Sequence, residues 1–318
     1  MIHRWAEMTG PAIEALDRQR TVVLVACSPL EVHGPHLPTM ADLREGEGLA
    51  HAAAALLAER HPEISFIELP WVWMAADVLP HRGSIKFRPS TVAQVLAEMG
   101  ESLARQGWKH VWVTSFHGGP RHVVALEEGC HRAHQATGIE MISVFSLLVS
   151  RLTGGSSDLG SLLGGLGGIA RDELVGDAHG GLVETAMLLH LAGAHVDPRH
   201  RDLPPRSLEL ELAEAGKPPM HAGDKATLIE LLRSFPMRHR YYERETYAGA
   251  PGKATAELGK LYVERLAQEA ADALSERYTG TLPVSRCHSP LWPLRRIMLS
   301  ERLGKLFETL VSTRHSPV

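Results

Sequence analysis

Apolar residues along the chain follow two patterns, and each pattern predicts one kind of element. Short uninterrupted runs rich in valine and isoleucine, such as "TVVLVAC" at 21–27, are typical of buried strands. Longer segments carry apolar residues three and four positions apart, a spacing that predicts helices with one buried face. The predicted strands span 21–27, 64–69, 110–116 and 140–148. The predicted helices span 42–60, from Ser90 or Thr91 to Gly107, 123–134, a loop entering a helix at 179–193, and 253–278.

Strands that alternate with helices favour parallel βαβ units whose helices cover both faces of the sheet, so the predicted fold class is α/β. Two segments fall outside this pattern. Residues 150–176 are rich in glycine and serine, and we expect either a flexible linker or a mobile flap over a site. Residues 281–318 contain prolines followed by an amphipathic stretch, which predicts a packed helix or a subunit contact.

Composition narrows the function classes. The chain has 318 residues, 44% hydrophobic and 22% charged, as expected for a globular protein with a substantial core. A net charge of -4 argues against a nucleic-acid partner, which would require a basic surface. Cys27, Cys130 and Cys287 lie far apart, which argues against a disulfide framework or a zinc–cysteine site. No apolar run of about 18 residues occurs, so we expect a cytoplasmic protein with no membrane partner.

Chemistry-bearing side chains follow two of the predicted strands. The segment "LEVHGPHLPTMAD" at 30–42 places Glu31, His33, His36 and Asp42 directly after the first strand, and His117 follows the strand at 110–116. Ligands of open parallel sheets bind at the carboxyl ends of the strands, so we expect these side chains to meet. Carboxylates and imidazoles are ligands suited to zinc, manganese or iron, and one bridging carboxylate is what a pair of ions requires.

Each of these residues also has a purely structural interpretation. Asp42 could cap the helix at 42–60, since aspartate is a favoured N-cap residue. His117 could bond a carbonyl in a turn, and Glu184 could be a polar residue on a helix face. Five such residues at strand ends favour metal binding as a set. Other polar or aromatic residues could contact substrate, but a bland position is favoured for each. A solvated loop position is slightly favoured for His81, Arg82 and His122, and core or subunit packing is favoured over a substrate wall for Trp71 and Trp73.

The segment "EVHGPHLPTMAD" resembles the E-x-H-G-P-H-L-P-x-x-x-D signature of the creatininase family of metal-dependent amidohydrolases. Three further blocks are similar to family motifs and occur in the same order along the chain. They are "TSFHGGP", "DAHGGLVETAM" and "GAPGKATAELGKLYVERL". The blocks run from about 21 to 278, so the resemblance covers most of the chain.

The resemblance implies one three-layer α/β/α domain with a mostly parallel central sheet, here 1–280, with 281–318 as an extension. It implies a homo-oligomer, usually a hexamer, and a centre of two divalent ions (zinc, manganese or iron). By position, the residues matching family metal ligands are Glu31, His33, Asp42 and His117. Asp42 matches the bridging carboxylate and His36 a residue that orients a ligand. His179 resembles the catalytic histidine that donates a proton to the leaving nitrogen.

The chain also departs from the family pattern. Creatininases carry a glutamate ligand two residues after the histidine that matches His117, and Gly119 stands there instead. The resulting H-G-G sequence resembles the branch with formamide deformylases and the mycofactocin-maturation peptidase, in which Glu184 would complete the metal shell as ligand and catalytic residue. Other departures are Ser115, Pro120 and the segments 75–78 and 81–85. In the family these positions shape the substrate site, so the departures weaken the case for creatinine as the substrate.

The expected function is a metal-dependent amidohydrolase that cleaves a non-peptide C–N bond, cyclic or linear, of a small-molecule amide. Alternatives on the same centre are a formamide deformylase or a small-peptide hydrolase. A family member that keeps the metal but acts as a non-catalytic scaffold subunit is a further alternative. Phosphoester hydrolysis ranks lowest, because no basic cluster that would hold a phosphate accompanies the proposed ligands.

Overall fold

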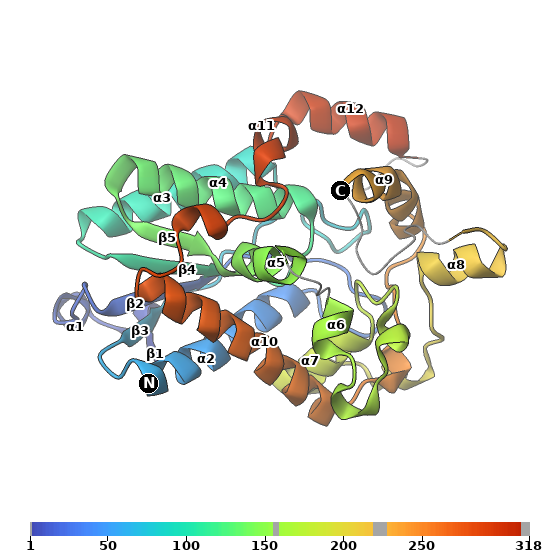
Figure 1. Cartoon of the computed structure of the whole chain (residues 1–318), viewed down its shortest axis with the longest axis horizontal. Coiled ribbons are helices and arrows are strands. Elements are labelled where there is room, and N and C mark those ends of the chain that lie inside the picture. The colour runs from blue at the N-terminus through green and yellow to red at the C-terminus, as the bar shows by residue number, and fades with distance from the viewer. Residues whose placement is uncertain (1, 155–158, 219–227, 313–318) are drawn as a thin grey trace.

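The computed structural model describes residues 2–154, 159–218 and 228–312, and its centre is one five-stranded sheet (Figure 1). The strands are β1 (Ile2–Arg4), β2 (Thr21–Ala26), β3 (Ser65–Glu68), β4 (His110–Thr114) and β5 (Glu140–Ser143). Their order in the sheet is β1-β3-β2-β4-β5, and every pairing is parallel. The predicted parallel sheet is therefore confirmed.

Helices cover both faces of the sheet (Figure 1). One face packs against α3 (Pro89–Arg105) and α4 (Pro120–Thr137), and the other against α2 (Ala41–Arg60), α5 (Val144–Gly154), α7 (Leu182–Ala192) and α10 (Ala256–Tyr278). The three-layer α/β/α fold is confirmed. The remaining helices are α1 (Gly10–Glu14), α6 (Leu159–Leu163), α8 (Leu208–Glu214), α9 (Leu228–Tyr242), α11 (Arg295–Met298) and α12 (Glu301–Val311).

Side chains of β2 alternate between the two cores, as the pleat of a strand requires. Val22 and Leu24 pack toward α2 and α10, whereas Val23 and Val25 pack toward α3 and α4. All four valine and leucine side chains are buried because a parallel sheet is covered on both faces. This explains why the strand has an uninterrupted apolar run rather than alternating polar positions.

The predicted strand at 140–148 is wrong in its second half, because β5 ends at Ser143 and α5 begins at Val144. The Ser143 hydroxyl accepts a hydrogen bond from the Ser146 amide at 3.3 Å, as a helix N-cap does. β1 was not predicted, since three residues are too few to show a period. Within 150–176, α5 continues to Gly154 and α6 follows, while 155–158 lie outside the described residues.

The order of the strands locates the ligand edge of the sheet. The connection after β2 leads to β3 on one side, and the chain then crosses to β4 on the other side. Such a reversal opens a crevice at the carboxyl ends of β2 and β4. The two histidine-rich segments of the sequence start at these strand ends, and α9 and α12 lie beyond this edge in Figure 1.

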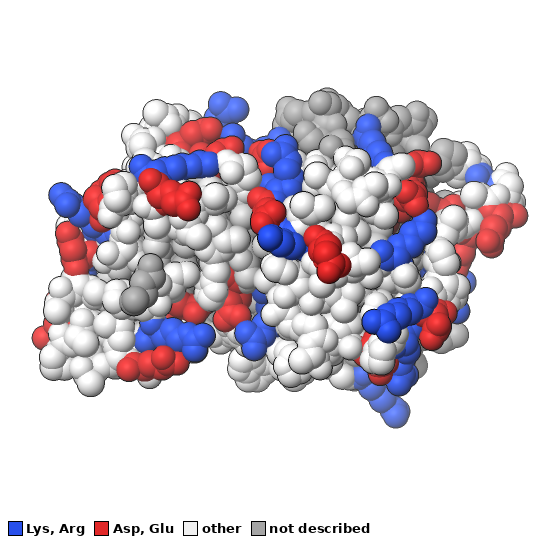
Figure 2. All heavy atoms as spheres, turned by 90° about the horizontal axis from the view of Figure 1, so that it is seen from below, with Lys and Arg blue, Asp and Glu red and all other residues white. Residues whose placement is uncertain are grey.

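The surface carries charges of both signs. On the face shown in Figure 2, lysine and arginine side chains are intermixed with aspartate and glutamate. Within the described ranges, no helix combines the length and apolar character needed to cross a bilayer. The expected lack of a nucleic-acid partner stays a prediction.

Candidate metal centre

The predicted ligands come together at the carboxyl edge of the sheet, although four separate segments supply them. Glu31 and His33 lie in the loop after β2, Asp42 in the first turn of α2, His117 after β4, and Glu184 in the first turn of α7. Each is at most 8% exposed. A left-handed turn at residue 34 (φ 65°) returns the β2 loop toward α2, and glycine adopts that conformation without steric cost.

One group of ligand atoms is formed by His117, Glu31 and Asp42, whose ligand atoms all lie within 4.8 Å of one another. The Nδ1 atom of His117 lies 3.0 Å from Oε2 of Glu31 and 3.4 Å from Oδ2 of Asp42. Its Nε2 atom lies 3.0 Å from the Ala76 carbonyl oxygen, which assigns the ring proton to Nε2 in the neutral imidazole. The lone pair of Nδ1 then faces two carboxylate oxygens, and a cation between them would resolve this repulsion.

A second group is formed by His33, Asp42 and Glu184. The Nε2 atom of His33 lies 3.0 Å from Oδ1 of Asp42 and 3.7 Å from Oε2 of Glu184. Its Nδ1 atom lies 3.0 Å from the Glu31 carbonyl oxygen, so in the neutral ring Nε2 carries the lone pair. The two oxygens of Asp42 therefore face different imidazoles, which is the geometry of a carboxylate that can bridge two ions.

Asp42 does not cap α2, so the structural alternative for this residue is wrong. The N-cap position of α2 is Met40, and no side chain caps the helix. The Oδ2 atom of Asp42 and the Oε2 atom of Glu31 are buried and accept no hydrogen bond within the described part of the chain. Buried carboxylate oxygens without donors are costly unless a cation compensates them, so the residues present fit a metal centre.

The electrostatics of the centre favour positive charge beside the carboxylates. Burial alone would raise the pKa of Glu31 and of Asp42, but attraction to His117 lowers that of Glu31, and attraction to His33 and His117 lowers that of Asp42. Burial alone would lower the pKa of His33, yet Asp42 and the other carboxylates raise it to about 10. The pKa of His117 is raised for the same reason. The field that would retain protons on these imidazoles is the field that attracts divalent ions.

Glu184 and His179 complete this cluster from the segment that begins α7. Burial raises the pKa of Glu184 to about 8 despite its proximity to His33, and the Gly180 amide donates a hydrogen bond to Oε2. The His179 ring stacks on His33 with 4.0 Å between centroids, and its Nε2 lies 2.8 Å from the Val32 carbonyl oxygen. Burial, then repulsion from His33, lowers the pKa of His179 to about 4, so its ring is neutral at neutral pH.

His179 also offers a possible ligand atom to this cluster. Together with Glu31 and His33 it forms a third group whose ligand atoms all lie within 4.8 Å of one another. His36 lies apart from these groups, since its Nε2 atom is 2.8 Å from the hydroxyl of Thr185, the residue after Glu184. His36 therefore connects the β2 loop to the first turn of α7.

The loop between β3 and α3 supports the centre through its main chain. The Ala76 carbonyl accepts from His117, and the Leu79 amide donates to Oε1 of Glu31. Asp77 has a left-handed backbone (φ 57°) and accepts a hydrogen bond from the Arg121 amide at 2.6 Å. Because main-chain atoms make the contacts to both ligands, the side chains of this segment can differ from the family pattern without loss of support.

Gly119 lies where an added side chain would meet three close neighbours. A Cβ atom there would lie 2.5 Å from Nε2 of His117, 3.0 Å from Cβ of Asp77 and 3.1 Å from the Ala76 carbonyl oxygen. Real Cβ atoms essentially never approach other atoms within 3.0 Å. The glutamate that the family resemblance would place at this position thus clashes with these neighbouring atoms. Glu184 supplies a carboxylate to one of the three groups of ligand atoms.

The structure adds residues that the sequence did not reveal. Glu45 lies one turn after Asp42 on α2, is fully buried, and neither of its carboxylate oxygens has a hydrogen-bond partner among the described residues. Burial, Glu184 and Asp42 all raise its pKa. The sequence offered one signal for Glu45: it lies three residues after Asp42 in a predicted helix, so the two side chains share a helix face. Tyr242 of α9 also reaches the centre, with its ring edge against His179.

The preference for a solvated position of His122 is wrong. His122 lies in the first turn of α4, is fully buried, and its Nε2 atom is 3.2 Å from the Cys27 carbonyl oxygen. Burial and the neighbouring His117 lower the pKa of His122 to about 3, so the ring is neutral. His81 instead lies at the surface side, with Nε2 2.7 Å from the Tyr242 carbonyl oxygen.

Fold and site together define an α/β protein with a candidate metal centre at the carboxyl edge of its parallel sheet. Comparison with known families identifies the family of the chain. A model of the creatininase family, described as creatinine amidohydrolase, matches residues 6–274. The chain therefore belongs to the creatininase family. No match is found among curated proteins.

Solved structures share the fold. A putative creatinine amidohydrolase from Bacteroides fragilis is 20% identical, with a TM-score of 0.56 over 87% of this chain and 96% of that chain. A creatinine amidohydrolase (creatininase) is 18% identical, with a TM-score of 0.57 over 86% and 97%. A structure titled "Creatininase Mn" is 18% identical, with a TM-score of 0.57 over 87% and 99%. At these identities the likeness establishes the fold alone.

Proposed function

We propose that this chain is a metal-dependent amidohydrolase that cleaves a non-peptide C–N bond of a small-molecule amide at a centre of two divalent ions. One observation carries the proposal: the two oxygens of Asp42 face the ring nitrogens of two different imidazoles, those of His33 and His117. Membership of the creatininase family supports the amidohydrolase class, because its model is described as creatinine amidohydrolase.

In this proposal the two groups of ligand atoms hold one ion each. Glu31, Asp42 and His117 would hold the first, and His33, Asp42 and Glu184 the second. Carboxylate and imidazole donors suit zinc, manganese or iron. When bound, such ions polarise a carbonyl group and make water a nucleophile at neutral pH. The Ala76 and Glu31 carbonyl oxygens keep the two imidazoles in the orientation that binding requires.

His179 is proposed to transfer the proton. Its Nε2 atom is held by the Val32 carbonyl oxygen, so Nδ1 of the neutral ring is the atom that can accept a proton and pass it to the leaving nitrogen. The stacking of its ring on His33 fixes its place beside the ligand groups. The predicted homo-oligomeric assembly and cytoplasmic location are retained as part of the proposal.

The test combines metal analysis with a substrate panel. Purified wild-type protein should contain about two divalent ions per chain by inductively coupled plasma mass spectrometry. Asp42→Asn should lose both ions together with turnover, since each oxygen of Asp42 serves one site. The matched control is Asp202→Asn, an exposed aspartate outside the centre, which should keep both ions.

The panel should contain lactams, linear amides, formamides and small peptides, because the H-G-G sequence resembles the formamide deformylase and peptidase branch. Hydrolysis of an amide or lactam by wild type, lost in Asp42→Asn, is the expected result. An Asp42→Asn protein that retained two ions and full turnover would overturn the proposal. Fully metal-loaded wild type that hydrolysed nothing in the panel would favour the scaffold alternative.

A further inference from the structure

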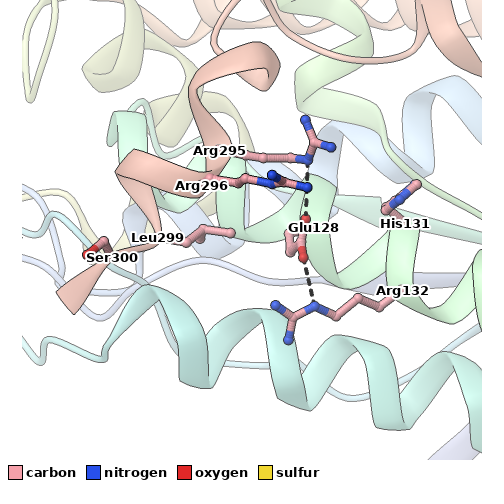
Figure 3. A pocket seen from close by; sticks show the side chains of 7 residues that line it. All are labelled: Glu128, His131, Arg132, Arg295, Arg296, Leu299 and Ser300. Carbon is pink, nitrogen blue, oxygen red and sulfur yellow. Dashed lines mark hydrogen bonds and ion pairs between the residues drawn. The ribbon is translucent and has the colours of Figure 1, made fainter.

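A separate cavity lies between α4 and the C-terminal segment that contains α11 (Figure 3). Its volume is about 360 Å³, within the range typical of small-molecule sites. The side chains of Arg295 and Arg296 extend from α11 toward α4, and Glu128 lies between Arg295 and Arg132 (Figure 3). The lining residues are Glu128, His131, Arg132, Arg295, Arg296, Leu299 and Ser300.

The lining carries excess positive charge. Glu128 is its only carboxylate, and it already has two arginine partners: Arg132 at 2.8 Å and Arg295 at 3.8 Å. Arg296 is exposed and forms no ion pair with any described residue. Three guanidinium groups against one carboxylate leave two positive charges uncompensated. The unmet charge requires either solvent ions or an anionic ligand.

The aromatic rings next to the cavity already pack against one another and against Arg295. Trp292 stacks on His288 with 4.1 Å between centroids and 3° between planes, and the Arg295 guanidinium carbon lies 4.4 Å from the Trp292 ring centroid. The His131 ring lies edge-on to the Trp292 ring, with 5.3 Å between the ring centroids. These contacts hold the Arg295 guanidinium in place before a ligand binds, which lowers the entropy cost of binding. Recognition in this cavity therefore depends on charge rather than on ring stacking.

We propose that this cavity binds a phosphate group, free or carried by a small organic molecule. Two uncompensated positive charges match a dianion better than a monocarboxylate. The planar guanidinium group also forms paired hydrogen bonds with phosphate oxygens. The volume of the cavity is several times that of a bare phosphate ion, which has only five heavy atoms, given that one water occupies about 30 Å³ in the liquid. It therefore leaves room for an organic part beside the anionic group.

This site is distinct from the candidate metal centre. Glu128 lies eight residues into α4 from Pro120, a rise of about 12 Å at roughly 1.5 Å per residue. None of the lining residues belongs to the three groups of ligand atoms at the centre. Arg121 connects the two regions, since its Nε atom donates to the Met298 carbonyl and its amide donates to Asp77. Binding here is expected to persist after metal is removed by a chelator.

The test is isothermal titration calorimetry on full-length protein, metal-loaded and chelator-treated, at constant ionic strength. The probes are glycerol 3-phosphate, inorganic phosphate and acetate. We expect saturable binding of a phosphate probe in both preparations and none of acetate. Tighter binding of glycerol 3-phosphate than of inorganic phosphate identifies an organic phosphate as the ligand class, and the reverse order identifies free phosphate.

Two substitutions that remove opposite charges from the cavity lining make the test specific. Arg296→Ala should weaken phosphate binding roughly ten-fold or more, because it removes an uncompensated guanidinium. Glu128→Gln should tighten binding, because it removes the competing carboxylate. Arg302→Ala is the matched control, an exposed arginine of α12 outside the cavity lining, and should change affinity less than two-fold. No saturable phosphate binding up to about 10 mM, or equal weakening by Arg296→Ala and Arg302→Ala, would overturn the proposal.

Discussion

Substituting Gly119 with alanine tests how tightly the candidate centre is packed. The backbone at 119 has φ -57° and ψ 117°, a conformation that alanine adopts without strain. Any effect must therefore come from the added methyl group. That group would lie 2.5 Å from Nε2 of His117 and 3.1 Å from the Ala76 carbonyl oxygen, so it would intrude on the hydrogen bond between them.

The magnitude follows from two costs. Inserting a methyl group into a packed site costs about 1–3 kcal/mol, and losing the His117–Ala76 hydrogen bond costs about 0.5–1.5 kcal/mol. The larger effect should be on metal affinity, because displacing the group that orients a ligand imidazole lowers affinity by roughly 10–100-fold. We therefore expect Gly119→Ala to unfold at lower denaturant concentration and to bind metal one to two orders of magnitude more weakly.

The matched control is Gly118→Ala. A Cβ atom at 118 would meet no atom within 4 Å, and the residue has no left-handed backbone, so this variant should resemble wild type. Metal affinity is measured by competition with a chromophoric chelator, and stability by urea unfolding of the metal-free protein. Equal metal affinity for the two variants would refute the reasoning, because it would mean that the loop at 76–77 yields without disturbing His117.

Three further predictions follow from named contacts. Glu184→Gln should reduce the metal content from about two ions to about one per chain by mass spectrometry, and retention of both would exclude Glu184 as a ligand. Burial raises the pKa of Glu127 to about 7, so stability is lost as the pH rises from about 4.5 through 7. By urea unfolding, the free energy of unfolding of Glu127→Gln should therefore exceed that of wild type by at most about 3 kcal/mol at pH 8 and equal it near pH 4. The exposed control Glu59→Gln should have the wild-type value at both pH values. Thr185→Val should cost about 1–3 kcal/mol by leaving Nε2 of the buried His36 unpaired.

The sequence was sufficient to place the candidate centre, because the physics that locates it is local and general. The apolar run before Glu31 marks a buried strand, and parallel strands present their carboxyl ends at one edge. That rule predicted that His117, 86 positions beyond Glu31 in the chain, would lie beside it, and the two side chains are 3.0 Å apart. The assignment of these side chains as ligands remains a prediction.

Several features of the fold and of the centre were not predictable from the apolar pattern alone. The chain at 140–148 is apolar throughout, and its period cannot distinguish a strand from a helix. In the structure the strand ends at Ser143, whose hydroxyl accepts from the Ser146 amide and caps the helix that follows. Glu45 is polar in an alanine-rich helix and would normally face solvent, yet the orientation of α2 that buries Asp42 also buries it. The support from Ala76 and Leu79 is main-chain only, so no side-chain motif could reveal it.

The two departures from the pattern that the family resemblance implies, Gly119 and the segment at 75–78, lie in contact with each other. The close approach of Ala76 and Asp77 to the position 119 backbone is what excludes a side chain there. The same approach brings the Ala76 carbonyl to His117, so the loop that removes one carboxylate also orients a neighbouring imidazole. Under the proposed function a carboxylate reaches the second group of ligand atoms from another segment, and Glu184 lies 3.7 Å from Nε2 of His33. Gly119→Glu in a Glu184→Gln background should therefore not restore the second ion by mass spectrometry, because the loop leaves no room for the added side chain.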